Sequence, residues 1–250
     1  MNTTARTPLS RCVSPHSDAP CPTASCRLRD ELRPGAALHL TESGILCNAP
    51  RGCSGNDYSC YYTGADFTRG YWVASAAQWV YQFLLSARAA DLATVAQSQI
   101  LGYPAGFDGL SGEWPCGSMV DWSERRLNHK FWAQIALLRA VARPFSFCDT
   151  AVTNAAGRGG ASRSPGTGTA GVNMKAANVS VYAQGLTSAR GRVLVLINTK
   201  ATQQAIDVPG AAGKRASTID NAVGNEAARE STLEADLVQL GAFATMFVRW

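Results

Sequence analysis

"ALHLTESGILCN", residues 37–48, is an apolar run that gives way to a single carboxylate at a turn, and the predicted architecture starts from it. The apolar segment has the length and content of a buried strand, which we expect over residues 36–42. Glu42 closes that strand, and Ser43 and Gly44 begin turn-like sequence. Taken alone, such an acid is most often a solvated loop residue. At the carboxyl end of a buried strand it is also a candidate for chemistry.

Two amphipathic helices are predicted on the carboxyl side of this strand. The first covers residues 68–90, where apolar side chains recur at steps of three and four: Trp72, Ala76, Trp79 and Phe83. The second lies in residues 128–144 and ends before its proline. Its apolar stripe is Phe131, Ile135, Leu138 and Val141. A second short strand is predicted between the helices, in residues 91–104, and a long Gly-rich loop follows each strand.

This order of strand, loop, helix, strand, loop and helix is typical of a parallel sheet with helices packed outside it. In a barrel built this way, active groups lie in the loops that follow the strands. Residues 1–36 show no such order. They are predicted to be irregular, apart from a short helix before Pro34.

The composition changes at residues 153–171, which are mainly Gly, Ala, Ser and Thr without a large apolar side chain. This stretch is interpreted as a linker. Beyond it, "NVSVYAQGL" alternates and "RVLVLINT" is continuously apolar. Further short runs follow between turn residues: "QQAIDVPG", "KRASTID" and "LGAFATMFVRW". Strands spaced so closely predict an antiparallel β-sandwich.

Composition and missing motifs exclude several classes of function. The formal net charge of +5 over 250 residues is scattered, so neither a nucleic acid nor a membrane surface is predicted as a partner. No apolar stretch is long enough for a transmembrane helix, and no signal peptide is visible. The chain has no C-x-x-C, G-x-S-x-G, H-E-x-x-H, Walker or dinucleotide-binding motif. We therefore predict no metal and no cofactor, and we make no prediction of oligomeric state.

Eight cysteines favour disulfides and hence an oxidising compartment, extracellular or along the secretory pathway. Five of them are the candidates: Cys47, Cys53, Cys60, Cys116 and Cys148. Pairs of Cys53 with Cys60, Cys47 with Cys116, or Cys116 with Cys148 all remain open, because connectivity does not follow from sequence.

Several stretches together resemble a known family. They are "LHLTESG", "TRGYW", "VAQSQILGYP", "MVDW" and "NHKFWAQIALL", followed by "RVLVLINT". In this order they resemble the closing part of a clan-A glycoside hydrolase barrel with its attached sandwich, nearest to the heparanase and β-glucuronidase group. The resemblance implies an α/β plus all-β fold, in which the last two βα units of a (β/α)8 barrel precede a C-terminal antiparallel β-sandwich. The implied divisions are an irregular segment 1–36, a partial barrel 37–150, a linker 151–175 and a sandwich 176–250.

The resemblance also implies a reaction. Glu42 matches the strand-end nucleophile of this clan, which attacks the anomeric carbon and forms a glycosyl-enzyme. The clan's acid/base, an Asn-Glu on the fourth strand, has no counterpart before Glu42. The Asn225-Glu226 pair lies in the β-module, and we interpret it as a coincidence. The chain is thus expected to be the C-terminal fragment of a retaining hydrolase of a polysaccharide or glycoside, inactive by itself.

Sugar contacts are expected from aromatic and polar side chains of the loops after the strands. Tyr103, Trp114 and Trp122 are placed to stack on a sugar ring, and Gln99 to bind a hydroxyl. For any single one of these aromatics, filling a loop interior is the better explanation. Four further acids are alternatives to Glu42: Asp66, Asp108, Glu113 and Asp121. The competing hypotheses for the chain are a non-catalytic carbohydrate-binding protein and a disulfide-stapled extracellular module.

Overall fold

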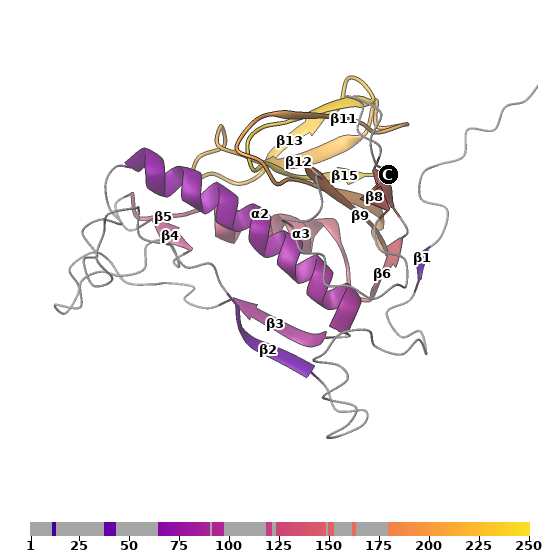
Figure 1. The fold of residues 1–250 in the computed structure, drawn as a ribbon, viewed down its shortest axis with the longest axis horizontal. Helices are drawn as coiled ribbons and strands as arrows, with labels where there is room; N and C mark the ends of the chain where they lie inside the picture. Colours follow the sequence, from indigo (N-terminus) through magenta and orange to yellow (C-terminus); the bar gives the residue numbers. More distant parts are fainter. Residues whose placement is uncertain are drawn as a thin grey trace, which may run out of the picture.

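A computed structural model describes residues 12–13, 38–43, 65–90, 92–97, 119–121, 124–148, 150–152, 162–163 and 180–250. Within these ranges the structure has three layers (Figure 1). A pair of short strands lies on one side, two helices lie in the middle, and a β-sandwich lies on the other side. Among the helices described, none is long and apolar enough to cross a membrane.

The first strand, helix and second strand form a βαβ unit. Strand β2 (Leu38–Ser43) pairs in parallel with β3 (Leu92–Gln97), and helix α2 (Ala65–Ala90) connects them. Parallel neighbours need a long crossover connection, and α2 supplies it. The two predicted strands and the predicted helix are therefore confirmed. Two parallel strands do not by themselves establish a barrel.

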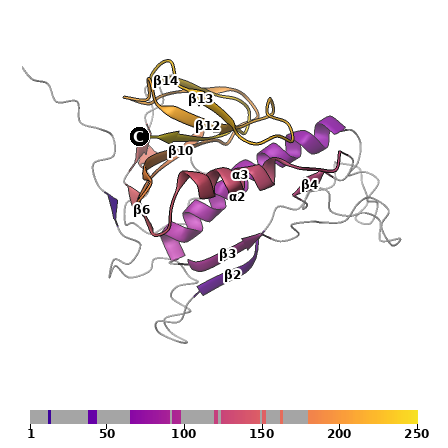
Figure 2. The same cartoon turned by 180° about the vertical axis from the view of Figure 1, so that it is seen from behind.

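Helix α3 (His129–Ala140) is confirmed, but its predicted apolar stripe is only partly right: Val141 is buried, whereas Phe131 and Ile135 are half-buried. Its buried residues are His129, Lys130, Ala133, Ala136, Leu137 and Ala140. Leu138, predicted to be buried, is 56% exposed. Small alanines allow α3 to approach α2 and strands β12 and β15 closely, so the face with the smaller side chains is the one that packs (Figure 2).

A seven-stranded antiparallel sheet forms the larger layer of the sandwich, in the order β1-β6-β9-β10-β15-β12-β13. Its strands in that order are β1 (Cys12–Val13), β6 (Phe145–Cys148), β9 (Val181–Ser188), β10 (Gly191–Asn198), β15 (Thr245–Arg249), β12 (Arg215–Ile219) and β13 (Arg229–Thr232). The smaller layer pairs β11 (Gln204–Asp207) with β14 (Leu237–Leu240). The predicted β-sandwich is thus present.

Both faces of the large sheet are buried at its central strands, β10 and β15. Side chains alternate along a strand, so Val195 and Phe247 face the helices while Leu196 and Met246 face β11 and β14. All four are at most 5% exposed. This double burial explains why "RVLVLINT" is continuously apolar instead of alternating.

Strands from both sides of the Gly-rich stretch contribute to the same sheet. Strand β6 precedes that stretch, yet it pairs with β9 beyond it. Strand β1 lies within the segment predicted to be irregular, so that prediction is wrong at Cys12–Val13. Within the predicted linker, β8 (Ser162–Arg163) pairs with β7 (Ala151–Val152). The short helix predicted before Pro34 lies outside the described residues.

Candidate functional site

The carboxyl ends of β2 and β3 form the candidate site. Leu40 pairs with Val95 and Ser43 pairs with Gln97, with a register shift between these two pairs. Two residues of β2, Thr41 and Glu42, therefore stand opposite one position of β3. This register shift has the two-against-one pairing of a β-bulge, a feature that is common beside active sites because it changes where side chains are presented. Glu42 is thus a bulge residue at the end of a parallel strand.

Two polar side chains of this strand pair are exposed and lie together. His39 Nδ1 lies 3.0 Å from Thr94 Oγ1, and both side chains are exposed. Helix α2 contacts β3 and also the sandwich strands β10 and β15. The strand pair therefore has a polar, hydrogen-bonded surface at His39 and Thr94, and its second strand lies against α2.

The other predicted sugar contacts lie outside the described residues. These are Gln99, Tyr103, Trp114 and Trp122, and their roles stay predictions. The same holds for Cys47, Cys53, Cys60 and Cys116. Cys148 lies in β6 and is disulfide-bonded, and the register of β1 with β6 sets Cys12 opposite it.

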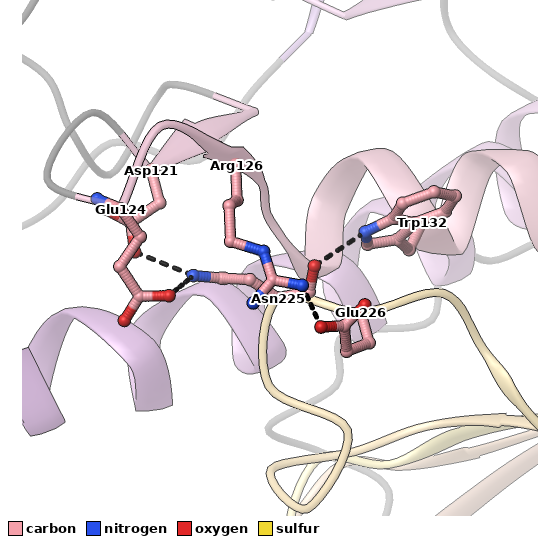
Figure 3. A network of polar contacts seen from close by, with 6 residues as sticks. All are labelled: Asp121, Glu124, Arg126, Trp132, Asn225 and Glu226. Atoms are coloured by element: carbon pink, nitrogen blue, oxygen red, sulfur yellow. Dashed lines mark hydrogen bonds and ion pairs between the residues drawn. The ribbon is translucent and has the colours of Figure 1, made fainter.

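A polar network joins the loop after β3 to the sandwich (Figure 3). The loop contains a small hairpin of β4 (Val120–Asp121) and β5 (Arg126–Leu127). The side-chain amide of Asn225, in the loop between β12 and β13, donates to Asp121 Oδ2 at 2.7 Å and to Glu124 Oε2 at 3.1 Å. Asp121 is only 3% exposed, so it is not a solvated loop acid. Its carboxylate is engaged in packing the hairpin.

Two further contacts complete this network. Trp132 Nε1 on α3 donates to the backbone carbonyl of Asn225 at 3.1 Å. Arg126 of the hairpin forms an ion pair with Glu226. Both residues of the Asn225-Glu226 pair therefore contact the hairpin or α3. Sequence reasoning missed this role, because no local signal connects partners so far apart in the chain.

A second network ties the end of α2 to the sandwich. Arg88 Nη1 donates to Gln184 Oε1 at 2.9 Å, and Gln184 Nε2 donates to the carbonyl oxygens of Cys148 and Gly185 at 2.9 and 2.8 Å. Burial raises the pKa of the neighbouring Tyr182 phenol, although the charge of Arg88 opposes that rise. These contacts fix α2 on β6 and β9.

Buried basic residues begin helix α3. Asn128 Oδ1 accepts a hydrogen bond from the Lys130 backbone N–H at 3.0 Å and caps the helix. Lys130 itself is 2% exposed, and burial lowers its pKa to about 8. Sequence reasoning did not single out Lys130. In the part of the chain that is described, no group of three or more His, Cys, Asp or Glu residues is arranged to hold a metal.

Comparisons with known proteins find a family match within the sandwich alone. Residues 179–248 match the family described as "D-apionate lactonase, C-terminal immunoglobulin-like domain". No curated protein matches the chain. The family match covers strands β9 to β15 and agrees with the sandwich architecture described above.

Similar solved structures include two enzymes of glycoside hydrolase family 30. The subfamily 8 xylanase Xyn30A from Clostridium acetobutylicum is 13% identical with a TM-score of 0.47, over 87% of this chain and 43% of that one. A family 30 endoxylanase from Clostridium papyrosolvens C71 is 14% identical with a TM-score of 0.44, over 89% and 44%. A conserved exported protein from Bacteroides fragilis is 13% identical with a TM-score of 0.46, over 89% and 41%.

The chain spans less than half the length of each of these three proteins. At such identities and TM-scores the likeness carries no statement about activity. The similarity found is to glycoside hydrolases of family 30, and the finer resemblance to the heparanase group has no support from it.

Proposed function

We propose that this chain is the C-terminal part of a retaining glycoside hydrolase that cleaves O-glycosidic bonds of a polysaccharide or glycoside. One observation carries the proposal: Glu42 lies in a bulge at the carboxyl end of a parallel strand, beside the end of a second parallel strand. In βα barrels the reacting groups lie at this edge of the sheet. The units β2-α2 and β3-α3 would then be the last two of a (β/α)8 barrel, with His39 and Thr94 facing its interior.

In this reaction the Glu42 carboxylate attacks the anomeric carbon as the bond to the leaving oxygen breaks. A carboxylic acid about 5 to 5.5 Å away gives its proton to that oxygen. The resulting glycosyl ester is opened by a water molecule, which the same group, now a base, deprotonates. The proposal assigns this acid/base to no residue of the chain, so the chain by itself should not hydrolyse glycosides.

The substrate class follows from the predicted loop side chains. Tyr103, Trp114 and Trp122 provide aromatic faces for stacking on sugar rings, and Gln99 provides a hydrogen-bonding amide. An extracellular or secretory location also belongs to the proposal. It is supported by the disulfide at Cys148, because disulfides persist in oxidising compartments.

The test is the Glu42→Gln substitution in the natural protein that contains this chain. Glutamine keeps the size of the side chain but is not a carboxylate, so turnover of an aryl glycoside should be lost while sugar binding is retained. Glu234→Gln, at an exposed glutamate of the sandwich, is the matched control and should keep its activity. Unchanged turnover of Glu42→Gln would remove Glu42 from the mechanism. Sugar binding without turnover in the unaltered protein would favour a non-catalytic binding protein.

A further inference from the structure

We propose that the loop between β12 and β13 positions the β4–β5 hairpin beside the sugar site, and that Asn225 is the positioning residue. The contact between loop and hairpin is observed in the structure. Its effect on sugar binding rests on the proposed function. The residues that form the contact are drawn in Figure 3.

The loop is held in shape before it meets the hairpin. Asp220 Oδ1 accepts hydrogen bonds from the backbone N–H groups of Ala222 and Val223 at 3.0 and 3.2 Å. Asp220 Oδ2 accepts from Arg229 Nη2 at 2.9 Å, where the chain enters β13. Gly224 has φ +62, a left-handed conformation that glycine adopts without strain. The loop therefore presents the next residue, Asn225, in a fixed position.

The hairpin is part of the loop that connects β3 to α3. Asp121 Oδ1 accepts from the Glu124 backbone N–H at 3.2 Å, and the Asn128 N–H donates to the Met119 carbonyl at 2.9 Å. These bonds close the hairpin and lead directly into the first turn of α3. In a βα barrel the loops after the strands form the substrate site. Figure 1 shows the hairpin on the side toward which the carboxyl ends of β2 and β3 point. The hairpin is therefore assigned to the rim of the proposed sugar site.

Asn225 is the main contact between the two segments. It is 6% exposed, and its amide donates to two carboxylates, which makes both hydrogen bonds charge-assisted. Its Oδ1 is buried without a hydrogen-bond partner. Turning the amide over would set that oxygen against Asp121 and Glu124, so the orientation is determined. The ion pair of Arg126 and Glu226 is 47% and 63% exposed, and such pairs contribute little.

Loss of the Asn225 contact should affect binding more than chemistry. The hairpin borders the proposed site but does not include Glu42. A displaced rim weakens the ground state and the transition state of the bound sugar equally, which raises KM and leaves kcat unchanged. A residue that only stabilised the fold would lower the amount of active protein without changing KM.

The experiment compares Asn225→Ala and Asn225→Asp with Asn221→Ala in the natural protein. Asn221 is an exposed asparagine of the same loop, so it matches the substitution without the contact. Hydrogen exchange of the hairpin amides, residues 120–127, should become about tenfold faster in both Asn225 variants and stay unchanged in Asn221→Ala. KM for the sugar should rise about tenfold in the Asn225 variants at unchanged kcat.

A double variant tests the same contact independently of the single substitutions. Asp121→Asn combined with Asn225→Asp restores one amide donor and one carboxylate acceptor across the contact, and should return the exchange rate toward that of the unaltered protein. Unchanged exchange in Asn225→Ala would overturn the contact. Faster exchange with unchanged KM would overturn the positioning role. Absence of turnover in the unaltered protein would overturn the proposed function, while exchange would still decide the contact.

Discussion

The side-chain amide of Asn225 donates to Asp121 Oδ2 over 2.7 Å, although 104 positions of sequence separate the two residues. This bond joins the hairpin before α3 to a loop of the β-sandwich. The large sheet of the sandwich also packs one face on both helices, through residues such as Val195 and Phe247. The helices and the sandwich therefore share a core and should unfold as one cooperative unit.

Phe247→Ala tests this shared core. Phe247 is fully buried between the sheet and the helices, so its truncation should lower the free energy of unfolding by about 3 to 5 kcal/mol. Far-ultraviolet circular dichroism, which reports the helices, and near-ultraviolet circular dichroism, which reports aromatic packing, should shift together. Leu237→Ala, at a side chain that is 50% exposed, is the control and should change stability by less than about 0.5 kcal/mol. Two separate transitions, with only one shifted, would show that the layers are independent.

Lys130 should make stability depend on pH in the alkaline range. Burial lowers its pKa from 10.5 to about 8, so between these values the unfolded chain binds a proton that the folded chain does not. The contribution of Lys130 to the free energy of unfolding therefore rises as the pH increases from about 8 to 10.5. Lys130→Met removes the burial of a charge, so at pH 7 its free energy of unfolding should exceed that of the unaltered protein. This advantage should shrink by about 2 kcal/mol from pH 7 to pH 9.5, because the unaltered protein gains stability over that range.

Denaturant unfolding at several pH values measures that advantage. Lys200→Met, at an exposed lysine, reports the effect of the substitution itself. An advantage for Lys130→Met that stays constant or grows with pH would contradict the assignment.

Asp236 should make stability depend on pH in the acidic range. Its carboxylate accepts hydrogen bonds from the backbone N–H groups of Ala212 and Gly210, which hold its pKa below the ordinary value. The stabilisation is present above the ordinary aspartate pKa and is lost as pH falls through the lowered pKa. Asp236→Ala should therefore lower the thermal unfolding midpoint at pH 7 and have a smaller effect at pH 3. Glu234→Ala, in the same connection between strands, is the control; an effect of Asp236→Ala that grows toward acid would refute this role.

The βα part of the fold was predictable because its signals are local. Strands β2 and β3 and helix α2 each carry their own apolar pattern. The buried face of α3 was not predictable from the largest apolar side chains, because close packing on α2 selects alanines such as Ala133 and Ala136 and leaves Leu138 exposed. The apolar pattern predicted where the helix lies in the sequence but not which of its faces is buried.

Strands that form only because a partner strand pairs with them were missed. Strand β13 has four exposed residues and no apolar pattern, and it is a strand only because β12 pairs with it. Strands β1 and β6 join the sheet across long sequence separations. The position of Glu42 at a strand end was predictable from its own sequence. The bulge that contains it was not, because a register is a property of two strands together.

Covalent trapping is the most direct measurement of the role assigned to Glu42. A 2-deoxy-2-fluoro glycoside with a strongly activated leaving group slows opening of the glycosyl-enzyme and needs little help from the acid, so the ester accumulates. The natural protein would be inactivated with this reagent, digested and sequenced by mass spectrometry. If Glu42 is the nucleophile, we expect one fluoroglycosyl group, carried by the Glu42 side chain. A label on another carboxylate, or an enzyme that turns over sugar without forming any ester, would contradict it.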